Sequence, residues 1–188
     1  MKTLNYPFKR EEILELKVGD MVLITGKLFT GRDAVHHRIH KGTKPPVNLE
    51  NQIIYHCGPV VLENKDGSYK VTAAGPTTSI REEPYEWEVM RDYKILGVIG
   101  KGGMGPKTLQ GCKDYGCVYM HAIGGAAQVL AEKITSVENV YWRDLGSPEA
   151  IWELNVVEFP VVITMDAHGN SLHKDIEDSS AIKLKEIL

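Results

Sequence analysis

Cysteine is scarce in this sequence, and the cysteines that are present do not form a recognised motif. Three occur among 188 residues, at positions 57, 112 and 117, and a small, odd number argues against a disulfide framework. Cys112 and Cys117 are separated by four residues, which is too many for a CxxC zinc or redox pair. The low cysteine content favours a reducing compartment, and we therefore expect a cytoplasmic protein.

The sequence also lacks long apolar runs and any strong excess of one charge. No stretch approaches the length of a membrane-spanning helix, and residues 1–4 lack the apolar core of a secretory signal. The net charge of −3 gives no reason to expect nucleic acid or a membrane surface as a partner. Internal repeats and long linkers are absent as well, so we expect a single domain over residues 1–188.

What the sequence does contain is an alternation of short apolar runs and helical segments. The apolar runs predict strands, and an Asp-Gly pair at 66–67 predicts a hairpin in the first half of the chain. Alternating strands and helices with one hairpin indicate an α/β fold with a mixed sheet. Strands are predicted at 21–25, 53–57, 60–62, 69–74, 95–99, 116–123, 137–142 and 159–165, and helices at 33–41, 82–93, 107–114, 126–134 and 148–154.

The densest group of polar side chains follows the predicted strand 69–74. A Gly-Pro turn between a strand and a helix would direct several backbone N–H groups to one point, as in anion-binding sites. Hydroxyl residues before a helix are equally typical of an N-cap, so the segment predicts either an anion site or a cap. The sequence there is GPTTSIR, with Gly75, Thr77, Thr78, Ser79 and Arg81 as its candidate site residues.

Two further strand ends carry cationic residues. Arg32 and Asp33 follow one apolar run after a short linker, and Lys101 lies in the glycine-rich segment 100–103. Open α/β sheets collect ligands at the carboxyl ends of their strands. Two arginines and a lysine at this edge suit a ligand with two carboxylates, and phosphate is the competing ligand. The spacings of a P-loop and of a dinucleotide-binding GxGxxG motif are both absent, which argues against a nucleotide.

The histidines are a weaker signal. His36 and His40 are spaced for one face of a helix, but no HExxH motif accompanies them, and we assign no metal ligand to this chain. His56, in a predicted strand, is expected to be a core histidine with satisfied hydrogen bonds. Cys57 beside it is expected to be a buried thiol, and Asp166, in a polar turn, is expected on the surface.

The three polar segments together resemble one known family. They read TGRDA at 30–34, GPTTSIR at 75–81 and GKGGM at 100–104. In this order and spacing they resemble the β subunit, or C-terminal domain, of class I iron–sulfur fumarate hydratases and of the related L-tartrate dehydratases. The resemblance implies a swivelling β/α/β domain, in which a mixed central sheet is flanked by helices. It also implies reversible hydration of fumarate to L-malate, a hydro-lyase reaction of the tricarboxylic acid cycle.

The same resemblance implies a cofactor and a partner. Complete enzymes of this family contain an oxygen-sensitive [4Fe-4S] cluster, whose cysteine ligands belong to the α subunit or N-terminal domain. This chain would then bind no cluster itself and would be inactive without the α subunit. The family also suggests a homodimer.

Residue roles carried over from the family concern the three polar segments. Arg32 and Arg81 are similar to the arginines that bind the substrate carboxylates, and Lys101 is similar to the lysine that completes that pocket. Thr77 resembles the threonine proposed as the base that removes the C3 proton of malate. Asp33 would orient Arg32. Two alternatives stay open at this point: L-tartrate as the substrate, or a non-catalytic module that binds dicarboxylates.

Overall fold

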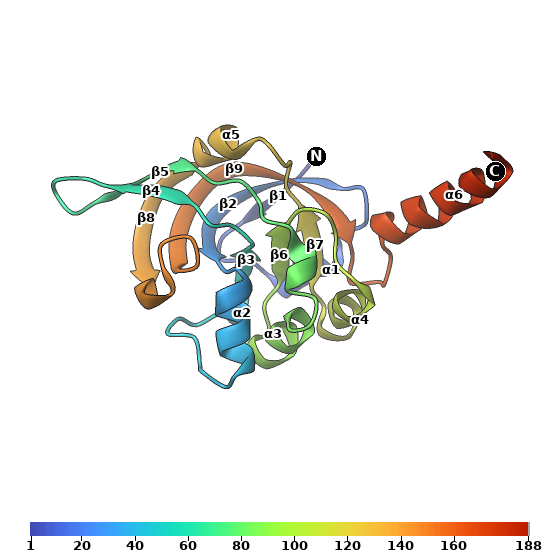
Figure 1. Cartoon of the computed structure of the whole chain (residues 1–188), viewed down its shortest axis with the longest axis horizontal. Coiled ribbons are helices and arrows are strands. Elements are labelled where there is room, and N and C mark those ends of the chain that lie inside the picture. The colour runs from blue at the N-terminus through green and yellow to red at the C-terminus, as the bar shows by residue number, and fades with distance from the viewer. Residues whose placement is uncertain (188) are drawn as a thin grey trace.

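The computed structural model describes residues 1–187, and a seven-stranded mixed sheet forms its centre (Figure 1). Its strands are β1 (Lys2–Asn5), β2 (Met21–Thr30), β3 (Ile53–Tyr55), β6 (Gly97–Gly100), β7 (Val118–His121), β8 (Ile134–Tyr141) and β9 (Ile151–Met165). They lie in the order β1-β2-β3-β6-β7-β9-β8, and β9 also pairs with β2. Strands β2, β3, β6, β7 and β9 therefore form a closed ring of hydrogen-bonded neighbours.

The direction of the strands confirms the prediction of a mixed sheet. The pairs from β1 to β7 are parallel, whereas β9 runs antiparallel to β2, β7 and β8. The predicted hairpin is also present: β4 (Val60–Glu63) and β5 (Tyr69–Ala73) pair antiparallel around the Asp66-Gly67 turn. This hairpin extends away from the main sheet (Figure 1).

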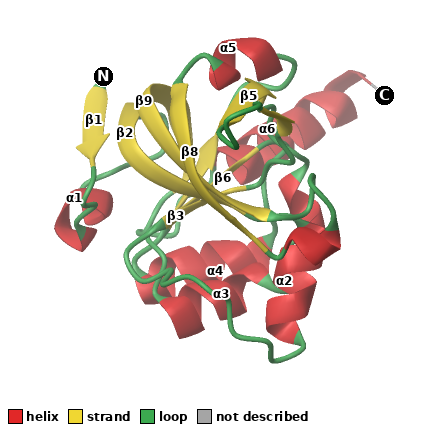
Figure 2. Cartoon of the chain, turned by 90° about the vertical axis from the view of Figure 1, so that its left-hand side faces the viewer, coloured by secondary structure: helices red, strands yellow, loops and turns green. Residues whose placement is uncertain are grey.

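Helices cover the sheet on both sides. Figure 2 shows α2, α3 and α4 together on one side and α5 on the other. The sixteen-residue helix α6 projects away from the body of the molecule in Figure 1 and has no buried residue. The helices are α1 (Arg10–Leu14), α2 (Asp33–His40), α3 (Glu86–Tyr93), α4 (Pro106–Tyr115), α5 (Ala127–Ala131) and α6 (Leu172–Ile187).

Two large apolar clusters explain why the central strands read as continuous apolar runs. Along β3, Ile53 and Tyr55 belong to one cluster and Ile54 belongs to the other. The same division separates Ile99 from Val98 in β6. Because successive side chains point to opposite faces, a strand buried on both sides needs apolar residues at every position.

One predicted element was wrong. Residues 148–154 were expected to form a short helix, but strand β9 begins at Ile151 and continues for fifteen residues. Alanine, leucine and glutamate favour a helix locally, yet this segment pairs with β2 on one side and β8 on the other. The hydrogen bonds and the apolar burial supplied by two neighbouring strands override the local preference. The first strand, β1, was not predicted at all.

Within residues 1–187, none of the helices combines the length and the apolar character needed to cross a bilayer. The extent of the domain over 1–188 stays a prediction.

Candidate functional site

Parallel strands bring the predicted site residues to one edge of the sheet. Arg32 follows the end of β2, and Lys101 follows the end of β6. Strand β3 lies between β2 and β6 and is parallel to both. The carboxyl ends of these strands therefore meet at the same edge, where α/β sheets hold their ligands.

The segment 75–81 crosses this edge and is pinned to it by backbone contacts. Thr78 forms a parallel bridge with Lys101. The amide of Ser79 donates to the Lys101 carbonyl at 3.0 Å, and the Lys101 amide donates to the Thr77 carbonyl at 3.2 Å. The Thr77 amide donates in turn to the His56 carbonyl at 2.7 Å. Thr77 and Lys101 are thus held side by side, as an extension of the β3–β6 pairing.

The start of the segment is fixed by close packing. Gly75 lies against Ala127 at the start of α5, where an added Cβ would be 3.0 Å from the alanine side chain. Ala74, the residue before it, donates its amide to the carbonyl of Ala127 at 2.9 Å. Pro76 forms a bridge with Cys57. The turn is therefore held from two sides before the hydroxyl residues begin.

Arg32 is braced by a carboxylate that the sequence did not reveal. Its Nε lies 3.2 Å from Oε1 of Glu149, and the other oxygen of Glu149 accepts from the Ala34 amide at 3.1 Å. Arg32 also packs against Gly58, where an added Cβ would lie 2.5 Å from the guanidinium. Asp33, which we expected to orient Arg32, is exposed in the first turn of α2.

Arg81 and Lys101 differ from Arg32 in their surroundings. Arg81 is exposed and Lys101 is half-buried. Among residues 1–187, no carboxylate lies within ion-pair distance of either side chain. Two cationic groups that lack an internal partner can accept an anionic ligand without first breaking an ion pair. We call Arg32, Thr77, Arg81 and Lys101 the strand-end site.

The hydroxyl residues of the segment do not act as helix caps. Residues Ser79–Arg81 form a short 3-10 turn, and α3 begins at Glu86 rather than at 82 as expected. Thr78 takes the cap position without a side-chain cap bond. Ser79 is buried and turns its hydroxyl inward. The cap interpretation of this segment is therefore wrong.

Beneath the segment lies a connected group of buried polar side chains. His56 places Nδ1 at 2.8 Å from Oγ of Ser79 and Nε2 at 3.0 Å from Oε2 of Glu86. His36 places Nε2 at 3.0 Å from the same oxygen of Glu86. The Tyr119 hydroxyl donates to Ser79 Oγ at 3.0 Å. We call His36, Glu86, His56, Ser79 and Tyr119 the buried chain.

Charge stabilises the centre of the buried chain. Burial alone would lower the pKa of His36, but the neighbouring Glu86 carboxylate and the Arg32 carbonyl raise it to about 9. Burial alone would raise the pKa of Glu86, but the two imidazoles beside it lower it to about 2. At neutral pH these values give an imidazolium paired with a carboxylate, both fully buried.

The two histidines spaced along one face of α2 do not share a site. His36 faces the interior, whereas His40 lies at the surface with Nδ1 at 2.7 Å from Oε2 of Glu88. The expectation for His56 is confirmed, because it is buried and both of its ring nitrogens have partners. The expectation that Cys57 is a buried thiol is also confirmed.

The glycine-rich segment after β6 is anchored by a second carboxylate. Glu83 accepts from the Gly105 amide and from the Lys107 amide, both at 2.8 Å, and from the Thr108 hydroxyl at 2.6 Å. These donors belong to the first turn of α4, whose free N–H groups need acceptors. Glu83 thereby ties the chain just after Arg81 to the chain just after Lys101.

The cysteines of this chain do not fit an iron–sulfur cluster. Cys57 belongs to one apolar cluster, whereas Cys112 and Cys117 belong to the other. A [4Fe-4S] cluster needs several thiolates that converge on one point. All three thiols are buried, and burial raises the pKa of Cys57 to about 12. The cysteines of this chain are therefore not suited to be the ligands of such a cluster.

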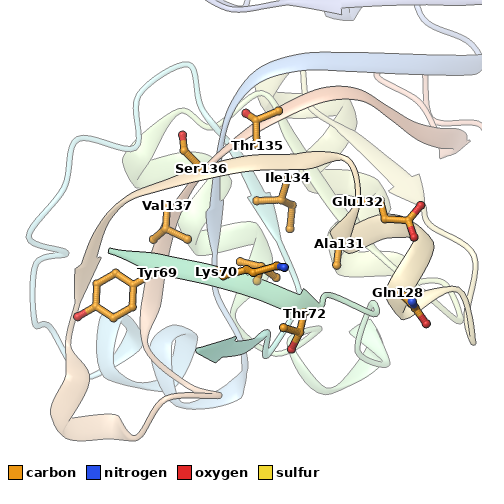
Figure 3. Close-up of a pocket in the computed structure, with 11 residues that line it drawn as sticks. Tyr69, Lys70, Thr72, Gln128, Ala131, Glu132, Ile134, Thr135, Ser136 and Val137 are labelled. Carbon is orange, nitrogen blue, oxygen red and sulfur yellow. The ribbon is translucent and has the colours of Figure 1, made fainter. Parts of the chain in front are cut away.

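A hollow of about 480 Å³ lies elsewhere on the molecule (Figure 3). Its walls come from β5, α5 and β8, with Lys70, Gln128 and Ser136 among the lining residues. None of the residues of the strand-end site lines it. This hollow is therefore separate from the strand-end site.

Comparison with known proteins identifies the family of this fold and site. A sequence model of the family described as "Fumarase C-terminus" matches residues 2–176. The chain belongs to this family. The three polar segments from which the resemblance was inferred therefore led to the correct family.

Three relatives differ in how much of their own length this chain covers. "Putative fumarate hydratase class I" of Geobacillus stearothermophilus is 55% identical over 184 residues, which cover 98% of this chain and 36% of that protein. "Putative L(+)-tartrate dehydratase subunit beta" of Methanocaldococcus jannaschii is 40% identical over 194 residues, covering 98% and 99%. "L(+)-tartrate dehydratase subunit beta" of Escherichia coli K12 is 38% identical over 173 residues, covering 91% and 86%.

Sequence reasoning missed the acidic residues that support this fumarase C-terminus site. Glu83, Glu86 and Glu149 lie outside the three polar segments and look like ordinary charged residues in the sequence. Their partners are distant in the chain: Glu149 contacts Arg32, and Glu86 contacts His36 and His56. Glu86 begins α3 on the same helix face as the buried residues Val89 and Met90, and this position on an apolar face could have served as a signal.

Proposed function

We propose that this chain is the β subunit of a two-subunit hydro-lyase that converts fumarate and L-malate into one another. The observation that carries the proposal is the backbone pairing of Thr77 and Ser79 with Lys101 at the carboxyl edge of the sheet. This pairing holds a hydroxyl and a cation together, next to the loop that bears Arg32. Membership of the fumarase C-terminus family supports this function.

The charges of the strand-end site suit a four-carbon dicarboxylate. Arg32 and Arg81 each offer a planar fork that can bind one carboxylate through two hydrogen bonds, and Lys101 adds a compact charge. With both carboxylates held, the carbon chain between them lies in a fixed position. Such orientation lowers the entropic cost of reaching the transition state.

Thr77 is the candidate base for the reverse direction, in which L-malate loses water. Its Oγ would take the proton from C3 as the C2 hydroxyl leaves, and in hydration it would return that proton. None of the hydrogen bonds described for residues 1–187 involves this hydroxyl, so its activation depends on groups from outside the chain. We therefore propose that the α subunit, with its [4Fe-4S] cluster, completes the site and that the isolated chain is inactive.

Substrate identity is the finer part of the proposal. The relatives include proteins named for fumarate and proteins named for tartrate. Tartrate also has two carboxylates and would use the same arginines, so the strand-end site supports either substrate. We assign fumarate and L-malate, because the Geobacillus stearothermophilus relative, which is 55% identical to this chain, carries the name of a fumarate hydratase.

The test is reconstitution of the complete enzyme. The chain is mixed with its cluster-bearing partner without oxygen, and kcat/KM is compared for L-malate and L-tartrate. We expect L-malate to be the better substrate by a large factor, and a preference for L-tartrate would overturn the assignment. Thr77→Ala should abolish turnover without preventing assembly, and Thr78→Ala, a neighbouring threonine of the same segment, is the matched control. Turnover by the chain alone would contradict the proposed division of the site.

Calorimetric titration separates this proposal from a simple binding module. A half-site predicts that L-malate binds the chain alone weakly and binds the assembled enzyme well. Equally tight binding to the chain alone would favour a non-catalytic dicarboxylate-binding module instead.

A further inference from the structure

The buried chain contacts all three loops of the strand-end site. His36 places Nδ1 at 2.9 Å from the carbonyl of Arg32. At the other end, Ser79 lies inside the segment 75–81, its hydroxyl accepts from Tyr119, and its amide donates to the carbonyl of Lys101 at 3.0 Å. The loops after β2, β5 and β6 are therefore joined below the surface through hydrogen bonds and the ion pair between His36 and Glu86.

We propose that the buried chain sets the relative positions of these three loops, and that His36, His56 and Ser79 are positioning residues for dicarboxylate binding. The kinetic consequences of this inference rest on the proposed function. The arrangement of the three loops rests only on the contacts described above. None of the three residues needs to touch the substrate, because each acts through a residue or loop that does.

The partners assign a direction to every hydrogen bond in the buried chain. His36 faces two acceptors, the Arg32 carbonyl and the Glu86 carboxylate, so both of its nitrogens carry protons. His56 donates from Nε2 to Glu86, which leaves Nδ1 to accept from the Ser79 hydroxyl. Ser79 accepts in turn from Tyr119. Removal of His56 or Ser79 leaves a buried hydrogen-bonding partner unsatisfied. The contact between His36 and Glu86 is an ion pair in which Nε2 has no aligned hydrogen bond.

The local packing shows that the chain has little room to rearrange. Ser79 Oγ occupies the space next to Gly100 where any side chain would begin, because an added Cβ would overlap with it. His36 and His56 also pack edge to face, with ring centroids 5.1 Å apart. A displacement of Ser79 would therefore move the segment that carries Thr77 and Arg81.

A metal ion is the competing occupant of the same place. Ligand atoms of His36, His56 and Glu86 lie within 4.8 Å of one another. In a metal site both Nε2 atoms would have to be free of protons. Here His56 Nε2 is aligned as a donor to Glu86 at 3.0 Å, which favours protons over a metal. Metal binding is therefore one of the outcomes that the second test distinguishes.

The kinetic test uses hydroxyl deletions in the assembled enzyme. Ser79→Ala and Tyr119→Phe should each lower kcat/KM for L-malate about tenfold, mainly through KM. The double variant should be no worse than Ser79→Ala alone, because both deletions break the same connection. Tyr141→Phe is the matched control: it removes a tyrosine hydroxyl that binds Glu153, far from this chain of contacts. It should leave KM unchanged.

Two kinetic results would overturn the proposal. One is an additive effect of the two deletions on KM. The other is a loss of thermal stability in Ser79→Ala and Tyr119→Phe with unchanged kinetics, since that would describe a merely structural role.

The second test needs no activity and therefore separates this inference from the proposed function. Nitrogen-15 NMR of histidine in the full chain should show both nitrogens of His36 protonated at neutral pH and His56 protonated at Nε2 only. Ser79→Ala should shift the Nδ1 signal of His56. A neutral His36, or shifts typical of metal-bound imidazole together with one equivalent of metal in the purified protein, would overturn the proposal. If the wild-type enzyme had no hydratase activity, this measurement would still decide the matter.

Discussion

The two arginines assigned to the substrate carboxylates are held in different ways. Arg32 is braced by Glu149, packs on Gly58 and has its carbonyl bound by His36. Arg81 is exposed and, within residues 1–187, has no carboxylate partner. A braced arginine loses little freedom when it binds a ligand, whereas an exposed one must be ordered at that moment. In the proposed site, Arg32 is therefore held in position before a ligand binds. Arg81 would be ordered only by the substrate or by a partner subunit.

Replacement of the arginines should have the largest effect and should reveal this difference. Arg32→Lys and Arg81→Lys keep the charge but lose the two-pronged contact, so each should lower kcat/KM for L-malate on the order of 100-fold, or about 3 kcal/mol. Only Arg32→Lys should also lower the thermal stability, because it disturbs Glu149. Equal stability of the two variants in thermal unfolding would remove the distinction between them.

A pH titration of stability should test the brace that His36 provides. Its pKa is raised to about 9 in the folded chain, so its contribution to stability is complete below the ordinary value near 6.5 and is lost as the pH rises through about 9. Glu86, Glu82 and His56 face it, and burial raises the pKa of Glu82. Urea unfolding from pH 6 to 10 should show a loss of roughly 3 kcal/mol in the free energy of unfolding.

His36→Gln is the control for that titration. The variant should be less stable at pH 7 but should show a smaller further loss at alkaline pH. An alkaline loss as large as that of the wild type would assign the titration to another group.

Removal of the carboxylate that braces Arg32 should have a smaller effect. Glu149→Gln keeps the size of the side chain but weakens its hold on Arg32, so KM for L-malate should rise about tenfold with kcat little changed. The matched control is Asp144→Asn, which removes the exposed partner of Arg38 and should leave KM unchanged. An unchanged KM in Glu149→Gln would show that Glu149 does not position Arg32 for binding. The two arginines would then not differ in this respect.

Loss of the acceptor at the start of α4 should have the smallest effect. Glu83→Gln keeps one acceptor oxygen but loses the charge at a helix N-terminus, so the free energy of unfolding should fall by about 1 kcal/mol. Chemical denaturation measures this directly, and Glu177→Gln on the exposed helix α6 is the control. A loss no larger than that of the control would show that α4 is held by its apolar face alone.

The residues proposed to touch a ligand stand out in the sequence more clearly than the residues that hold them. Arg32, Thr77, Arg81 and Lys101 stand in short, unusual segments, and the strand pattern placed them at one edge. Glu149 and Glu86 could not be found in this way, since each acts on a partner far away in the sequence. The surface position expected for Asp166 was also wrong. It is buried and accepts from the amides of Val18, His168 and Asn170.

The elements of the fold also differ in how well the sequence predicts them. The apolar runs identified the central strands, because burial on both faces leaves a clear mark in composition. The helix expected over 148–154 and the cap considered for the segment 75–81 were mistaken, since helix-forming residues and hydroxyls are ambiguous without their neighbours. In both cases the deciding contact came from another part of the chain, namely β2 and β8 for the strand and His56 for the serine.

The close approach of Ser79 to Gly100 has a consequence for variation in this protein. Any side chain at that position would collide with the Ser79 hydroxyl and displace the segment that bears Thr77 and Arg81. A survey of random variants scored by growth on the substrate would therefore rank position 100 among the least tolerant. Glycine has no functional group, so this intolerance comes from the lack of room for a side chain beside Ser79. Such a survey taken alone would wrongly identify Gly100 as a catalytic or binding residue.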